Sequence, residues 1–144
     1  MFVVDTNVLV AAADRSSPIH VPCRKRIGDW QGQSAAWFLT LGICYEFLRV
    51  VTHARVLREP WRVADAWGFV AAILASPGAS LLVPTDRHPR VAAEVFAETP
   101  GIAGNLVHDA ATAVLMREHG IKTIYTRDAD FHRFRFLEVV DPTA

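Results

Sequence analysis

Residues 2–13 read FVVDTNVLVAAA, and the pattern of this stretch changes once, at Asp5. Phe2 to Val4 is a short apolar run rich in β-branched residues, which predicts a buried strand. Thr6 to Ala13 has the periodicity of a helix. A strand that passes directly into a helix begins a β–α unit, and such units build parallel sheets. Asp5 therefore stands at the carboxyl end of the first strand, the edge where open α/β sheets bind ligands.

The same alternation continues along the chain. Further strands are predicted at residues 34–37, 81–83, 122–126 and 136–140, and further helices at residues 19–30, 40–53, 63–75, 90–98 and 105–119. The strands are apolar throughout, as expected when helices cover both faces of a sheet. We predict one domain, residues 1–144, with an α/β fold: a three-layer α/β/α sandwich around a mainly parallel sheet of four or five strands.

The bulk composition is that of a globular protein with a large core. The chain has 144 residues, of which 51% are hydrophobic, and its basic and acidic residues balance at 15 each. Zero net charge argues against a protein that coats polyanions, but it allows a local basic patch. Cys23 and Cys44 lie in apolar helical contexts and are predicted to be reduced core thiols. The sequence shows neither a signal peptide nor a membrane span, so we expect a cytoplasmic protein.

Four acids stand out because each lies in a distinctive segment. Asp5 lies in VVDTN, Glu46 in ICYEFLRV, Asp109 in NLVHDAATA and Asp128 in IYTRDADF. Three of them have an ordinary structural explanation, as a helix cap, a solvated helix position and a turn residue. Asp109 is harder to explain in this way. It lies among small apolar residues, where a carboxylate needs a partner or a role.

Taken together, the four acids predict a metal site. If they converge within about 6 Å, each like-charge pair costs roughly 3 kcal/mol at an effective dielectric constant of ~20. No lysine or arginine lies in GNLVHDAATA, and Arg127 is the only basic residue beside the strand-end acids. A hard divalent cation, Mg²⁺ or Mn²⁺, would neutralise the cluster. Zinc is disfavoured, because the six histidines show no tight ligand spacing and no C-x-x-C motif is present.

Three segments carry a family resemblance that extends over nearly the whole chain. VVDTNVLVAA, the glutamate of LGICYEFLRV and the late block NLVHDAATAVLMREHGIKTIYTRDADF resemble a PIN domain, and specifically the VapC-type toxins of bacterial toxin–antitoxin pairs. The stretch from Arg55 to Thr99 contributes little to this likeness. The resemblance implies catalytic and metal-binding roles for Asp5, Glu46, Asp109 and Asp128. It also implies auxiliary roles for Asp130 and for Thr6, Asn7 and Thr126, which lie where the family positions water or orients the acids.

The activity implied by the resemblance is that of a metal-dependent endoribonuclease. With Mg²⁺ or Mn²⁺ as cofactor, attack by water on the phosphodiester would leave a 5′-phosphate and a 3′-hydroxyl. The implied substrate is structured RNA such as tRNA. The implied partners are a small DNA-binding antitoxin of the VapB type and a second copy of the chain in a homodimer.

Basic and aromatic side chains suggest where RNA or a partner would lie. Arg49, Arg127, Arg133 and Arg135 are predicted RNA contacts, and Arg55, Arg58 and Arg62 also follow the glutamate helix. The segment HRFR, residues 132–135, interleaves arginines with a phenylalanine, which suits stacking on unpaired RNA or, equally, a solvated face over a phenylalanine core. Trp61, Trp67, Phe69 and Val70 could form a contact surface, although core positions are the favoured interpretation.

Two other Mg²⁺-dependent classes of similar architecture fit the residues poorly. A receiver-type phosphoacceptor domain needs an aspartate at the end of the third strand, where this chain has Leu82-Val83-Pro84. A haloacid-dehalogenase-like phosphatase needs an aspartate two residues after the first, where this chain has Asn7. The remaining alternative is a PIN-like protein that binds RNA or a partner with little or no turnover.

Overall fold

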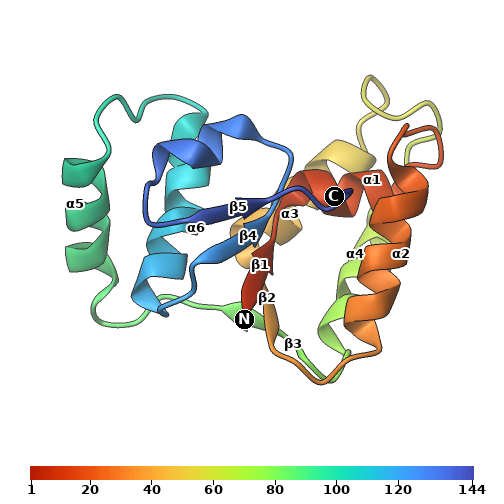
Figure 1. Ribbon diagram of the computed structural model, residues 1–144. Helices are drawn as coiled ribbons and strands as arrows, with labels where there is room; N and C mark the ends of the chain where they lie inside the picture. The colour runs from red at the N-terminus through yellow and green to blue at the C-terminus, as the bar shows by residue number, and fades with distance from the viewer.

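The computed structural model describes all 144 residues and contains a five-stranded sheet with helices on both faces (Figure 1). The strands are β1 (Phe2–Val4), β2 (Trp37–Thr40), β3 (Ala79–Leu82), β4 (Thr123–Tyr125) and β5 (Glu138–Val140). Their order in the sheet is β3-β2-β1-β4-β5, and every neighbouring pair is parallel. The predicted α/β class is confirmed, and the sheet is parallel throughout.

The helices divide between the two faces because the chain builds the sheet in two directions from β1. The helices are α1 (Thr6–Ala13), α2 (His20–Gln31), α3 (Leu41–Val51), α4 (Val63–Leu74), α5 (His88–Glu98) and α6 (Leu106–Glu118). Right-handed crossovers place α1 to α4 on one face and α5 with α6 on the other, which Figure 1 shows on the right and the left. A short 3₁₀ helix, η1 (Ala129–Arg133), packs against α6. None of the helices is long and apolar enough to cross a bilayer.

One strand lies away from its predicted position. The prediction for residues 34–37 overlaps β2 only at Trp37, whereas the other four strands and all six α-helices lie within two residues of their predicted bounds. The short helix η1 was not predicted. β2 pairs in parallel with β3, from Trp37 opposite Ala79 to Thr40 opposite Leu82. The strand therefore begins at Trp37 and contains the large apolar residues that follow the predicted segment. The Thr40 side chain then accepts a hydrogen bond from the Ile43 backbone N–H (3.1 Å), so it also caps α3.

A core of 31 buried apolar residues fills the space between the layers. Cys23 and Cys44 are buried, free thiols in this core, as predicted. Phe131 and Phe134 are also fully buried. The stacking role suggested for the HRFR segment is therefore wrong, because its phenylalanine is a core residue.

The aromatic residues of α4 and the loop before it have different environments. Val70 is fully buried, as the core interpretation predicted. Trp61 and Phe69 are partly buried and pack against Phe47, with ring centroids 6.2 and 5.1 Å from its ring. Trp67 differs from them, since 43% of its surface is exposed.

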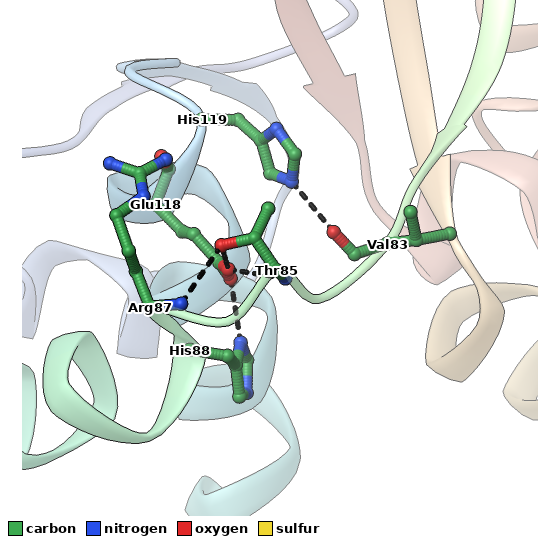
Figure 2. A network of polar contacts seen from close by, with 6 residues as sticks. All are labelled: Val83, Thr85, Arg87, His88, Glu118 and His119. Atoms are coloured by element: carbon green, nitrogen blue, oxygen red, sulfur yellow. Dashed lines mark hydrogen bonds and ion pairs between the residues drawn. The ribbon is translucent and has the colours of Figure 1, made fainter.

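A buried carboxylate joins the end of α6 to the loop that enters α5 (Figure 2). One oxygen of Glu118 accepts hydrogen bonds from the backbone N–H (2.6 Å) and the hydroxyl of Thr85, and the other pairs with Nδ1 of His88 (2.7 Å). Arg87 donates to the Glu118 carbonyl (2.9 Å). Burial by itself raises the pKa of Glu118, but the hydrogen bonds and the nearby His88 outweigh it and lower the pKa to about 2.

We expect Glu118→Gln to lower the free energy of unfolding at neutral pH by about 1–3 kcal/mol, because three donors on Thr85 and His88 lose a buried, charged acceptor. A folded-state pKa of about 2, against an ordinary 4.5, means that this stability is present above about pH 4.5 and is lost as the pH falls toward 2. The difference between wild type and variant should therefore narrow in acid. Urea denaturation across this range measures it. Glu94→Gln on exposed α5 is the matched control, and an equal loss there would contradict the prediction.

The turn into β3 offers a second test of the fold. A Cβ built on Gly78 would lie 2.2 Å from the backbone carbonyl oxygen of Ala35, and the Gly78 carbonyl accepts from the Trp37 N–H (2.9 Å). Gly78→Ala should destabilise the protein by about 2–4 kcal/mol, since neither backbone can move without disturbing β2–β3 pairing. Gly68→Ala, with open space around it in α4, should stabilise by about 0.5–1 kcal/mol. Thermal or urea unfolding of both variants would refute this account if their effects matched.

Candidate active site

The site forms where the strand order reverses, between β1 and β4. Asp5 follows β1 and Asp128 lies just beyond β4, and the two strands are neighbours in the sheet. The chain leaves these strands toward opposite faces, which opens a crevice at their carboxyl ends. The prediction that both acids occupy this edge is confirmed by their positions.

Asp5 is buried and held by three donors. Its Oδ1 accepts from the Thr6 backbone N–H (2.8 Å), and its Oδ2 accepts from Asn7 Nδ2 (2.6 Å) and from the Thr126 hydroxyl (2.7 Å). Burial raises the pKa of Asp5 to about 6, against the lowering effect of the hydrogen bonds from Thr126 and Thr6. The negative charges of Glu46 and Asp128 raise this pKa further. Asp5 thus caps α1 and at the same time presents a carboxylate of fixed orientation to the crevice.

The hydroxyl of Thr126 links the two strand ends. It donates its proton to Asp5 and accepts from Asn7 Nδ2 (2.8 Å) and from the Asp128 backbone N–H (2.9 Å), which uses its full bonding capacity. The Asn7 side-chain oxygen in turn accepts from the Arg127 N–H (3.1 Å). These bonds give Asn7 and Thr126 the geometry of residues that orient the acids.

The tightest acidic group consists of Asp109, Asp128 and Asp130. One carboxylate oxygen from each lies within 4.8 Å of the others. Asp109 comes from the first turn of α6, Asp128 caps η1, and the Asp130 N–H donates to Asp128 Oδ1 (2.9 Å). Asp130, predicted only as an auxiliary acid, is therefore part of this group, whereas Asp5 and Glu46 stand outside it.

Burial raises the pKa of Asp109 to about 7, helped by the neighbouring carboxylates, first Asp128 and then Asp5, Glu46 and Asp130. A carboxyl of this kind holds its proton until the surrounding negative charge is neutralised.

Glu46 projects from α3 on the opposite side of the crevice. Its Oε2 lies 3.2 Å from the Thr6 hydroxyl, which donates to it, and its Oε1 lies 3.5 Å from Arg49. Glu46 and the other four acids line one groove of about 730 Å³ between α3 and α6. Among the groove residues, Arg49 is the only lysine or arginine, so the groove carries an excess of negative charge.

This donor set suits a hard divalent cation. The ligand atoms are carboxylate oxygens, which Mg²⁺ and Mn²⁺ prefer, and the groove lacks the thiolates of a soft-metal site. Asp109, Asp128 and Asp130 have the spacing to share one ion. Asp5 Oδ2 already accepts two hydrogen bonds, so its remaining capacity lies mainly on Oδ1.

Of the arginines predicted to contact RNA, only Arg49 lines the groove. Arg127 lies 3.5 Å from Asp141, and Arg133 lies 3.5 Å from Asp130 at the edge of the acidic group. Arg135 is exposed. Their contacts with RNA stay a prediction.

Tyr45 also lines the groove and was not predicted. Its signal was the spacing of Gly42, Tyr45 and Arg49, at i, i+3 and i+7, which puts all three on one side of α3.

With this geometry established, comparison with known proteins identifies the family. The PIN domain profile matches residues 2–137. Ribonuclease VapC48 of Mycobacterium tuberculosis is 31% identical over 138 residues, covering 96% of this chain and 94% of the relative. Ribonuclease VapC43 of the same species is 35% identical over 137 residues, covering 95% and 92%. The chain belongs to the PIN-domain family and, within it, to the VapC ribonucleases.

Solved structures agree with this fold. Mycobacterium tuberculosis VapC20, described as a Sarcin-Ricin loop cleaving toxin, superposes with a TM-score of 0.65 at 22% identity over 92% of this chain and 93% of its own. VapBC2 from Rickettsia felis, bound to a DNA fragment from its promoter, gives a TM-score of 0.68 at 14% identity, with 96% of each chain covered.

Without metal, Asp109→Asn should raise the free energy of unfolding. A folded-state pKa of about 7, against an ordinary 3.8, means that the native state favours protonated Asp109, so stability falls as the pH rises from about 4 to 7. The neutral amide removes this cost, which we put at about 1–2 kcal/mol at pH 8 after allowing for solvent screening. Denaturation in EDTA at pH 8 and at pH 5 measures the gain, which should shrink at the lower pH.

With Mg²⁺ added, the wild type should become more stable than Asp109→Asn, because an ion that binds only the native state stabilises it. The wild type should gain stability from Mg²⁺ at pH 8, and Asp109→Asn should gain much less. Asp86→Asn, an exposed change in the loop before α5, is the control for loss of one negative charge. An Asp109→Asn protein less stable than wild type in EDTA at pH 8 would show that the acidic groove is not strained.

Proposed function

We propose that this VapC-type ribonuclease is the toxin of a toxin–antitoxin pair and hydrolyses RNA phosphodiester bonds with Mg²⁺ or Mn²⁺ as cofactor. The observation that carries the proposal is the groove between α3 and α6, where five carboxylates face one arginine. So much like charge in one place is costly in the free protein and useful only if a cation binds there.

Each acid has a distinct task in this proposal. Asp109, Asp128 and Asp130 are the direct ligands, since their oxygens lie within 4.8 Å of one another. Asp5, fixed by its three donors, is a further ligand or holds a coordinated water. Glu46, on the opposite wall, is likewise a further ligand or holds a coordinated water, and the Thr6 hydroxyl orients it.

A bound Mg²⁺ supplies a Lewis acid for the phosphate and lowers the pKa of coordinated water. The protein supplies a rigid frame for this chemistry, because the hydrogen bonds of Thr126 and Asn7 fix Asp5 and the backbone beside Asp128 before substrate arrives. Arg49, 66% exposed at its side chain and only 3.5 Å from Glu46, can turn to a substrate phosphate.

The proposed substrate and partners follow from the relatives. Structured RNA such as tRNA is the proposed substrate, consistent with curated relatives that are named ribonucleases. An antitoxin of the VapB type is the proposed partner, supported by the VapBC2 complex of similar fold. We further propose a homodimer located in the cytoplasm.

Cleavage of total RNA and purified tRNA by the antitoxin-free protein tests the function. Cuts should appear with Mg²⁺ or Mn²⁺ and disappear in EDTA, and the fragments should carry 5′-phosphate and 3′-hydroxyl ends. Asp109→Asn and Asp130→Asn should each reduce the rate by about 100-fold or more, because each removes a charged ligand. Asp86→Asn should cut at the wild-type rate.

Fragments ending in a 2′,3′-cyclic phosphate would contradict hydrolysis by water, since they require attack by the substrate's own 2′-hydroxyl. Metal-stabilised protein that cuts neither RNA pool would favour the alternative of a PIN-like protein that binds RNA or a partner without turnover.

A further inference from the structure

An exposed aromatic side chain stands in the wall of the acidic groove without a role in metal binding. Tyr45 is 60% exposed, an unusual fraction for a large aromatic residue, and it lies one position before Glu46 on α3. Trp67 of α4 packs against its ring, with centroids 6.3 Å apart and planes inclined by 26°.

The position of the two rings leaves one face of Tyr45 available. Tyr45 lines the groove, but Trp67 does not. Trp67 therefore contacts the tyrosine ring from outside the groove, and the 60% exposure of Tyr45 leaves much of its surface free. A third ring could stack on the free face, because aromatic rings favour offset stacking at such separations.

The side chains around Tyr45 suit one nucleotide. Gly42 lies in the preceding turn on the same side of the helix and also lines the groove, so it adds no side chain to the wall at that position. Arg49, one turn further along, offers a guanidinium for a phosphate. Leu106 and Leu115 of α6 supply apolar surface to the same groove.

We propose that Tyr45, supported by Trp67, is a stacking platform for an unpaired nucleobase of the RNA next to the bond that is cut. A base inside an A-form duplex has both faces covered by its neighbours, so the platform selects a loop, a bulge or a single strand. Stacking tolerates any base, because every base has a π-face, so Tyr45 selects unpaired structure and not sequence. This inference rests on the proposed function, since it places RNA in the acidic groove.

Binding of short fluorescent oligoribonucleotides, measured by anisotropy with Ca²⁺ to neutralise the acids, tests the platform. The probes are oligo(U), an abasic oligomer of equal length and a blunt RNA duplex. Tyr45→Leu should bind oligo(U) about 5- to 100-fold more weakly than wild type. Tyr45→Phe should bind within about twofold of wild type because it keeps the ring. The abasic oligomer should bind wild type and Tyr45→Leu equally.

Phe96→Leu on α5 is the matched control, because it removes a similarly exposed ring from the other face of the sheet. It should leave oligo(U) binding unchanged. Equal oligo(U) binding by wild type and Tyr45→Leu would overturn the proposal, and so would an equal loss of abasic and oligo(U) binding in the variant, which would indicate a change of charge or shape.

Light scattering of the same variants tests the competing use of this surface by a second copy of the chain. Around Trp67, the outer side of α4 carries the small residues Ala64, Gly68 and Ala71, which would allow close packing of a partner helix. A Tyr45→Leu protein of smaller assembled mass than wild type would overturn the stacking platform in favour of that interface; unchanged mass supports the platform.

The outcomes separate this inference from the proposed function. Tyr45-dependent binding by a protein that never cuts RNA would refute the nuclease and support the platform. Metal-dependent cutting at equal rates by wild type and Tyr45→Leu, on single-stranded RNA below saturation, would refute the platform and support the nuclease.

Discussion

The hydrogen bond from the Thr126 hydroxyl to Asp5 is the contact on which the site depends. It joins the carboxyl ends of β1 and β4, the two strands between which the order of the sheet reverses. A carboxylate as buried as Asp5 would be costly without such donors. The same hydroxyl accepts from the Asp128 N–H, so one side chain sets both the first acid and the start of the loop that carries Asp128 and Asp130. The groove can be rigid before any cation binds because these bonds are made within the protein.

Helix α6 carries two carboxylates whose environments drive their pKa values in opposite directions. Asp109 lies in its first turn, where the helix dipole favours the ionised form by about 0.3–1 kcal/mol, yet burial and neighbouring acids raise its pKa to about 7. Glu118 ends the helix, where the dipole disfavours its charge, yet hydrogen bonds lower its pKa to about 2. Burial and neighbouring charges outweigh the dipole at Asp109, and hydrogen bonds outweigh it at Glu118. Glu118 has all its partners within the protein and stabilises the fold. Asp109 has no neutralising partner within the protein, so its charge lowers the free energy of unfolding until a cation is bound.

Much of the fold could be predicted because the secondary structure has local signals. Apolar runs end at Asp5 and near Thr126, and glycine and proline separate the helices, so most elements lie within two residues of expectation. The exception is β2. Both Ser34–Ala36 and Trp37–Leu39 could have formed the strand, and pairing with β3 selects the second segment. Burial of Phe134 was equally open, because a phenylalanine between two arginines looks the same in sequence whether it faces RNA or the core.

By itself the sequence determined the alternation of strands and helices and the placement of Asp5 and Asp128 at the strand ends. It also determined the protein family, through the segments that contain the acids. Those features depend on residues close together in the chain. Only the tertiary structure decided that Asp130 joins Asp109 and Asp128, that Asp5 is enclosed by Asn7 and Thr126, and that Tyr45 lines the acidic groove and packs against Trp67. Each of these is a distance between side chains on different elements. Such distances are set by how the helices pack on the sheet, which local periodicity does not encode.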